Sequence, residues 1–189
     1  MNSERLSDFR VAILAADFFE ESELIEPRKA LDEAGATTVV IAPHGGEIKA
    51  AHHEKETGSV KVDQTLNEAD PARFDALLLP GGKKNAAALR DEPLAQDFVR
   101  YMNQLHRPIA SICHGGWLLV SANLVKGRHM TSYPEIRQDF VKADAFWTDN
   151  PVVRDGNFVS SRQPSDIPQF NQEMLNLFAD HKLRARTAA

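Results

Sequence analysis

Short apolar runs that alternate with helix-like segments constrain the fold of this chain more than any other feature. Residues 9–16 and 37–42 are apolar and partly β-branched, as buried strands are. Between them, residues 22–34 carry apolar side chains at helical spacing and end at Gly35. A strand, a helix and a strand in this order predict parallel pairing with a right-handed crossover.

The alternation continues along the chain and predicts an α/β fold with a mainly parallel sheet. We expect further strands at 59–62, 75–79, 109–112, 128–131, 145–147, 152–154 and 158–160, and helices at 84–89, 93–105, 117–120, 134–142 and 165–180. We expect residues 1–8 to be a loose polar lead-in, residues 44–58 a loop with a small hairpin, and the chain after His181 to fray. The 189 residues suffice for one domain, 1–189, with its core at about 9–180.

Composition narrows the class of protein. A hydrophobic content of 42% indicates a globular chain, and a net charge of −5 offers no basic face for nucleic acid. The polar start of the chain does not resemble a signal peptide, and no apolar run is long enough to span a membrane. One cysteine excludes an internal disulfide and suits a reducing compartment. We therefore expect a cytoplasmic protein.

The single cysteine, Cys113, follows an apolar run and precedes Gly115-Gly116 and a helical pattern. It is therefore predicted to lie on a sharp strand-to-helix turn, like the nucleophile of a hydrolase elbow. Backbone N–H groups and the helix dipole at such a turn favour an anion, which predicts a lowered thiol pKa and a reactive cysteine. The alternative is a small buried core residue, which is common for free cysteine.

In a parallel sheet the active crevice lies beyond the carboxyl ends of the strands. This rule brings together residues 17–23, 80–82 and 113–114. Of the acidic residues in the first segment we place Glu23 in the site, while charge complementation of the helix start explains the others equally well. A carboxyl group beside a thiolate is stable only when protonated, so we expect a raised pKa for Glu23.

The backbone N–H groups of Gly81, Gly82 and His114 are candidates for holding an oxyanion. The His114 side chain is either a general acid–base group or a structural residue. Histidines elsewhere show no ligand spacing, and no phosphate-loop pattern follows the glycines, so we expect no metal and no cofactor.

At these residues the chain resembles the ThiJ/PfpI superfamily, in its branch of PfpI-type intracellular proteases. The resemblance rests on residues 19–20 with 23–27, 74–82, 112–115, 124–128, 131–134, 152–153, 155–157 and 160–162. It implies a flavodoxin-like three-layer sandwich, a nucleophile at Cys113, a protonated partner at Glu23 and a catalytic histidine at His114. It also implies a homodimer or larger ring with the site near the subunit interface, and links to oxidative or general stress.

Two departures from the family pattern bear on proteolysis. Peptidase-type members carry an acid just past Gly-Gly that reaches the histidine of a neighbouring subunit, where this chain has Asn85 and Ala86. His114 is therefore expected to lack an orienting carboxylate. The family also has Pro-Gln after Cys-His-Gly, where this chain has Gly116-Trp117. We expect Trp117 to line the crevice, together with Glu20 and Tyr133.

The resemblance favours a stress-response enzyme acting on a reactive carbonyl such as methylglyoxal, or on glycated groups. Cys113 would attack the carbonyl carbon, Glu23 would relay protons, and the backbone of Gly82 and His114 would hold the oxyanion. Three alternatives stay open: an intracellular cysteine peptidase, a redox sensor that works through oxidation of Cys113, and a relic fold that stabilises a partner.

Overall fold

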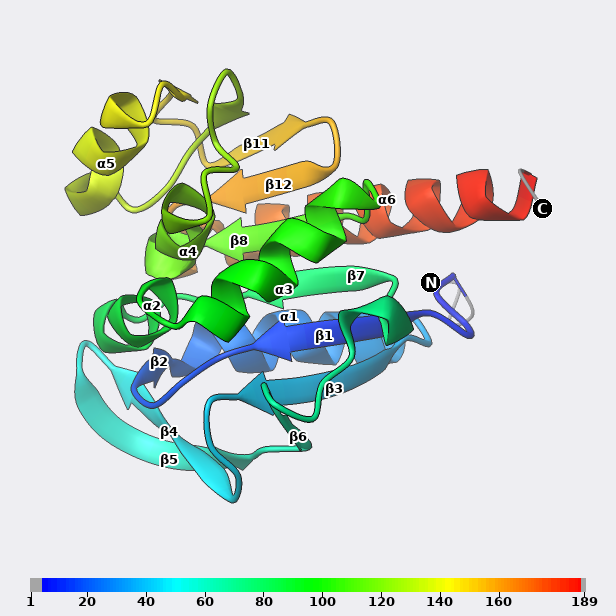
Figure 1. Ribbon diagram of the computed structural model, residues 1–189, viewed down its shortest axis with the longest axis horizontal. Coiled ribbons are helices and arrows are strands. Elements are labelled where there is room, and N and C mark those ends of the chain that lie inside the picture. Colours follow the sequence, from blue (N-terminus) through cyan, green and yellow to red (C-terminus); the bar gives the residue numbers. More distant parts are fainter. Residues whose placement is uncertain (1–4, 188–189) are drawn as a thin grey trace.

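The computed structural model describes residues 5–187 and is built on a 7-stranded sheet (Figure 1). In spatial order the strands are β11 (Val152–Asp155), β12 (Phe158–Ser161), β8 (Ile109–Ile112), β7 (Ala76–Leu79), β1 (Arg10–Leu14), β3 (Thr37–Ala42) and β6 (Gln64–Thr65). Every neighbouring pair is parallel except β11 with β12, which form a hairpin. The predicted α/β class with a mainly parallel sheet is confirmed.

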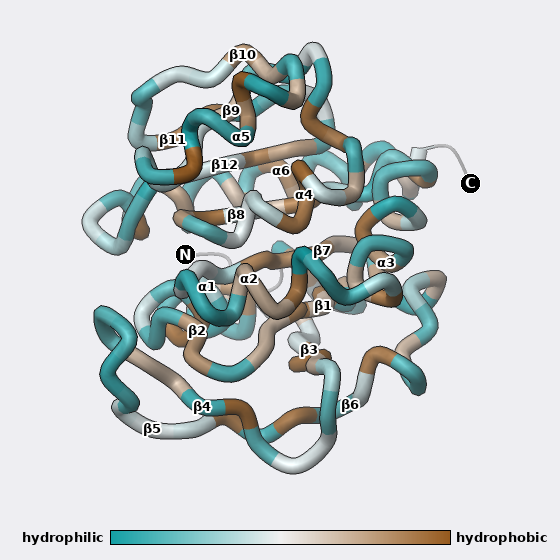
Figure 2. Tube along the Cα trace, turned by 60° about the vertical axis from the view of Figure 1, so that its left-hand side comes forward, coloured by the Kyte–Doolittle hydropathy of each residue, from teal (hydrophilic) through white to brown (hydrophobic). Residues whose placement is uncertain are grey.

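Helices cover both faces of this sheet and complete a three-layer sandwich. Figure 1 shows α1 (Glu21–Glu33) and α6 (Ile167–Thr187) behind the sheet, and α2 (Lys83–Arg90), α3 (Pro93–Gln104) and α4 (Trp117–Ser121) in front, with α5 (Arg137–Lys142) beyond α4. The side chains of Val11 and Ile13 pack into the core on the side of α1 and α6, and those of Ala12 and Leu14 into the core on the side of α2, α3 and α4. The central strands are therefore apolar on both faces, as the brown stretches of β1 and β7 show in Figure 2.

Two small sheets lie outside the main one. β2 (Phe19–Glu20), β4 (Glu47–His52) and β5 (Lys55–Lys61) form a three-stranded sheet, and β9 (His129–Met130) pairs in parallel with β10 (Phe146–Trp147). Short 3₁₀ helices lie at η1 (Pro71–Arg73), η2 (Cys113–Gly116), η3 (Pro134–Ile136) and η4 (Pro164–Asp166). The small hairpin predicted within residues 44–58 is present, since β4 and β5 pair through a turn at His53 and Glu54. Strand β5 continues to Lys61, into the stretch predicted as a separate short strand at 59–62.

Both ends of the described chain are more structured than predicted. Leu6 is fully buried, and its backbone N–H donates to the carbonyl of Ala34 at 2.8 Å. Helix α6 continues past His181 to Thr187, and Lys182 reaches the hydroxyl of Ser7 at 3.1 Å. This contact joins the two ends of the described chain. Among the described residues, no helix combines the length and apolarity that crossing a bilayer requires.

Candidate active site

Cys113 lies on a tight turn directly after β8, as predicted, and is the first residue of η2. Its φ is +60°, a left-handed conformation that is costly for a residue with a Cβ. The turn closes tightly because Gly115 lies against β7, where an added Cβ would come within 2.4 Å of the Leu79 carbonyl oxygen. The adjacent Gly116 lies against the ring of Phe140. The strained backbone holds the sulfur at the carboxyl edge of the sheet, with 8% of the residue exposed.

Glu23 reaches the same place from the start of α1 and has no exposed surface. Its Oε2 accepts a hydrogen bond from the backbone N–H of Gly81 at 2.9 Å, while Oε1 has no partner among residues 5–187. A Cβ on Gly81 would come within 2.1 Å of Glu23 Oε2 and 2.6 Å of the Cys113 Cβ. Only glycine lets the carboxyl group and the cysteine approach one another this closely.

The surroundings of Glu23 favour its neutral form. Burial raises the pKa of Glu23 to about 8, the nearby Glu20 carboxylate adds to the shift, and the Gly81 N–H opposes it. At neutral pH the group is therefore mainly a carboxylic acid with one proton to donate. The predicted direction of this shift is confirmed.

The predicted lowering of the thiol pKa is wrong for this structure. Burial raises the pKa of Cys113 well above its ordinary value, and negative charge on Glu23 raises it further. Hydrogen bonds from the backbone of His114 and Gly82 oppose these effects without overcoming them. Because the turn is buried, loss of solvent outweighs the helix-start dipole, so the resting group is a thiol that needs a base.

His114 supplies a base beside this thiol. Its Nδ1 lies 3.3 Å from Cys113 Sγ, so the two adjacent side chains do face one another. On the other side of the ring, Nε2 lies 3.0 Å from Oε2 of Glu135. The ring is buried and packs against Tyr133 and Trp117, with centroid separations of 4.9 Å and 5.6 Å. The expectation that His114 lacks an orienting carboxylate is therefore wrong.

The charges around His114 are consistent with a neutral ring. Burial lowers the pKa of His114, and the Glu135 carboxylate only partly offsets this effect. The Lys83 ammonium group bonds to Oε1 of Glu135 and lowers the pKa of that carboxyl group, which therefore stays ionised. An ionised carboxylate only accepts, so His114 Nε2 carries the hydrogen and Nδ1 is left as the acceptor facing sulfur.

These groups line a cavity of about 340 Å³ at the carboxyl edge of the sheet. Its walls are Phe18, Glu20, Glu23, His53, Glu54, Gly82, Lys83, Cys113, His114, Tyr133, Glu135 and Pro164. Of the side chains predicted to line the crevice, Glu20 and Tyr133 do so. Glu20 is held at the rim by His52, whose Nδ1 lies 2.8 Å from its Oε1.

Trp117 and Gly81 differ from the prediction. Trp117 lies behind His114 rather than in the cavity wall, because its Nε1 donates to Asp139 at 2.6 Å and Arg90 covers its ring. The N–H of Gly81 is already bonded to Glu23 and is not free to hold an oxyanion. Gly82 and the backbone of His114 remain as donors that face the sulfur.

Sequence reasoning missed Glu135 and Lys83. Glu135 directly follows the quoted 131–134 stretch, but an exposed acid after a proline carries no signal of the side it faces. The residues that replace the expected acid, Asn85 and Ala86, are both buried. Asn85 accepts from Ala16 N at 2.6 Å and donates to the carbonyl oxygens of Pro80 and Gly81. It therefore fixes the Gly81–Gly82 turn.

No group of three or more His, Cys, Asp or Glu side chains in residues 5–187 is arranged to hold a metal ion. The histidines of the polar loop pair with acids instead: His44 with Asp17 at 2.9 Å and His52 with Glu20. The chemistry of the site therefore has to be argued from Cys113, His114, Glu23 and Glu135.

Known proteins are similar in sequence to this chain over most of its length. The chain is 40% identical over 168 residues to Deglycase PfpI of Pyrococcus furiosus, covering 89% of this chain and 98% of that protein. It is 38% identical over 169 residues to "Putative cysteine protease YraA" of Bacillus subtilis, covering 89% and 97%. "Protein/nucleic acid deglycase 2" of Escherichia coli is also 38% identical over 169 residues, covering 89% and 96%.

Solved structures share the fold as well. Drosophila melanogaster DJ-1beta superposes with a TM-score of 0.82 at 26% identity, covering 90% of each chain. The sequence profile of the DJ-1/PfpI family matches residues 9–177, a span that contains every residue lining the cavity. The chain therefore belongs to the DJ-1/PfpI family.

Proposed function

We propose that this protein is a cysteine-dependent enzyme of the deglycase type that acts on reactive carbonyls and on the adducts they form with amines. The names of the Pyrococcus and Escherichia relatives support this class of activity. Cys113 is the proposed nucleophile, His114 its base, and Glu23 the acid that protonates the carbonyl oxygen. The backbone N–H groups of Gly82 and His114 are the proposed oxyanion donors.

The observation that carries the proposal is the arrangement of two neutral proton carriers around one thiol. His114 Nδ1, at 3.3 Å from sulfur, is an acceptor for the thiol proton. Glu23, with a pKa of about 8, has a proton to give and one oxygen without another partner among the described residues. Such a site generates its nucleophile and neutralises the developing oxyanion in the same step.

For methylglyoxal the proposed reaction balances without an external oxidant. Sulfur adds to the aldehyde carbon as the C=O π bond opens; the thiol proton goes to His114 and the oxygen takes the proton of Glu23. A proton then moves from the first carbon to the second through an enediol, which leaves a thioester. Water cleaves the thioester, giving the hydroxy acid and restoring the thiol. In an amine adduct of the aldehyde, the hydroxyl group loses its proton and the C=O bond re-forms as the carbon–nitrogen bond breaks. The nitrogen takes up that proton and leaves as the free amine, and sulfur then adds to the aldehyde carbon as before.

The test is methylglyoxal consumption and lactate formation by the wild type, Cys113→Ala and Cys113→Ser. We expect both variants to lose catalysed turnover while they retain the wild-type circular dichroism spectrum. A parallel assay follows release of free amine from methylglyoxal-treated N-acetyl-lysine. Equal rates for the wild type and Cys113→Ala in both assays would remove the proposal.

Peptidase activity is a second candidate, supported by the His114–Glu135 contact of 3.0 Å and by the name of the Bacillus relative. A cysteine, a histidine and an acid in series are the groups that cysteine peptidases use. Cleavage of a fluorogenic peptide that disappears in Cys113→Ser would establish it. An absence of cleavage alongside methylglyoxal turnover would leave the deglycase proposal alone.

A redox sensor at Cys113 fits less well, because oxidation proceeds through an accessible thiolate and this thiol is buried with a raised pKa. Intact-mass measurement after mild peroxide treatment distinguishes a sensor, which gains oxygen atoms without turning over carbonyls.

The name of the Escherichia relative includes nucleic acid, so glycated nucleotides belong in the substrate panel despite the net charge of −5. A cytoplasmic location, a stress role and a homo-oligomer remain parts of this proposal.

A further inference from the structure

We propose that Glu135 is the positioning residue of the site: it fixes the ring of His114 so that a cysteine–histidine–acid relay is complete within a single chain. The inference rests on the proposed role of Cys113 as nucleophile. Glu135 belongs to the same chain as Cys113 and His114, so the acid of the relay does not come from a neighbouring subunit.

The geometry is a line of contacts across the His114 ring. Cys113 Sγ lies 3.3 Å from Nδ1, and Glu135 Oε2 lies 3.0 Å from Nε2. Because one ring nitrogen faces each neighbour, the partner of Nε2 decides which nitrogen carries the hydrogen. A carboxylate at Nε2 leaves Nδ1 free to accept the thiol proton.

Glu135 is itself held in place from two sides. Its second oxygen bonds to the ammonium group of Lys83 at the start of α2. The backbone before it is anchored where Tyr133 N donates to the carbonyl of Cys113 at 3.2 Å and Thr131 N donates to the hydroxyl of Ser160 at 3.0 Å. The acid is therefore fixed relative to the cysteine although its side chain is 47% exposed.

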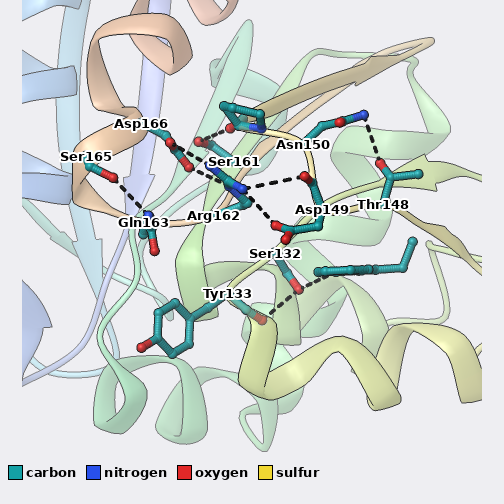
Figure 3. Close-up of polar contacts among 12 residues, drawn as sticks. Ser132, Tyr133, Thr148, Asp149, Asn150, Ser161, Arg162, Gln163, Ser165 and Asp166 are labelled. Atoms are coloured by element: carbon teal, nitrogen blue, oxygen red, sulfur yellow. Dashed lines mark hydrogen bonds and ion pairs between the residues drawn. The ribbon is translucent and has the colours of Figure 1, made fainter.

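A network behind this segment adds to the anchoring. Trp147 donates its indole N–H to the hydroxyl of Ser132 at 2.9 Å, and that hydroxyl donates to the carbonyl of Tyr133 at 3.1 Å. Figure 3 shows the contact between Ser132 and Tyr133, with the ring of Tyr133 turned away from it. That ring packs against His114 instead, so the segment supports the imidazole by stacking as well as through Glu135.

Several groups besides Glu135 face His114, and the test has to separate them. The charged neighbours are Lys83 and Glu54, the contact on the Nδ1 side is Cys113, and the rings of Tyr133 and Trp117 cover the faces. Of these groups, Glu135 is the one that hydrogen-bonds Nε2. Replacing its carboxylate by an amide of the same shape removes the charge and lets an N–H group face the ring.

The experiment measures Cys113 alkylation by iodoacetamide from pH 5 to pH 10 in the wild type, Glu135→Gln and Glu135→Asp. Because Cys113 is the chain's one cysteine, the reaction has no background from other thiols. We expect Glu135→Gln to lower the rate at pH 7 by about 10- to 100-fold, the worth of a charge-assisted hydrogen bond. Glu135→Asp should restore part of the rate, and the exposed Glu26→Gln on α1 should match the wild type.

A second readout follows the ring directly. Nitrogen-15 NMR of the histidines, with His114 assigned through His114→Gln, should show the Nε2-protonated tautomer in the wild type and a mixture in Glu135→Gln. The inference would be overturned if Glu135→Gln were alkylated at the wild-type rate and kept the Nε2-protonated tautomer. Neither readout uses a carbonyl substrate, so failure of the deglycase proposal in Cys113→Ala would be seen separately.

Discussion

Glu23 is the residue whose ionisation is most tightly linked to folding, because its side chain is fully buried. Its pKa rises from an ordinary value of 4.5 to about 8 in the folded chain. Between these values the folded state binds more protons than the unfolded state, so stability falls as pH rises through this window. The loss is at most about 1.4 kcal/mol per pH unit and stops above the folded pKa.

We therefore expect Glu23→Gln to remove this pH dependence. Glutamine has nearly the shape of the protonated acid, and its oxygen can accept the Gly81 N–H bond. Between pH 5 and pH 8 the free energy of unfolding of the wild type should therefore fall by about 3 kcal/mol more than that of the variant. Urea unfolding at these pH values measures the difference.

The exposed Glu26→Gln, on the same helix, is the matched control and should keep the wild-type pH profile. Parallel stability profiles for Glu23→Gln and the wild type would show that Glu23 does not fold in its neutral form.

The residues of the site differ in how readily the sequence predicts them. Cys113 was predictable because it directly follows a strand end, and Glu23 because it lies in the segment after the first strand, since the carboxyl ends of parallel strands meet at one edge. The direction in which the pKa of Cys113 shifts was not predictable, because it depends on how much solvent the folded turn excludes. Glu135 was missed because only the path of the backbone after β9 decides that it turns toward His114.

At the scale of elements, the site depends on how closely β7, α1 and the cysteine turn approach each other. Gly81 lies where all three meet, and an added Cβ would come within 2.1 Å of Glu23 Oε2 and 2.6 Å of the Cys113 Cβ. Neither neighbour can swing away easily, because one side chain is fully buried and the other is on a strained turn. A methyl group here must separate the elements.

We expect Gly81→Ala to lose turnover and to lower the free energy of unfolding by about 2 kcal/mol, as overpacking does. Gly58→Ala, on β5, is the matched control because a Cβ there meets no atom within 4 Å. Its stability should stay within about 0.5 kcal/mol of the wild type. Thermal melting and methylglyoxal turnover measure both, and a Gly81→Ala variant with wild-type values would contradict the tight approach.

Elements were predictable where burial leaves a pattern in the sequence. The apolar strands β1, β3, β7 and β8 lie where their runs predict them, because both of their faces are covered. The extent of β5 was not predicted, only a small hairpin within 44–58 and a short strand at 59–62, because residues Lys55–Lys61 are almost all exposed and carry no alternation. This strand pairs through backbone hydrogen bonds with β4, whose small sheet supports Glu20 and His53 at the cavity rim.

At the scale of the whole molecule, a single chain supplies the complete relay of cysteine, histidine and acid. Cys113, His114, Glu23, Glu135 and Lys83 all surround one cavity within a single copy. The family resemblance predicts a homodimer or ring with the site near an interface. In this chain an assembly would protect or shape the cavity without supplying the acid for His114.

This difference can be tested by dilution. If the relay is complete in one chain, methylglyoxal turnover per chain should stay constant as the protein is diluted through the concentration at which any assembly dissociates. Mass photometry at each concentration reports the oligomeric state, and lactate formation reports the rate. Glu135→Gln, diluted in parallel, should be slow at every concentration, because no partner carboxylate replaces the one removed. Turnover that falls in step with dissociation of the wild type would instead mean that a partner chain completes the site, since the groups named here do not change on dilution.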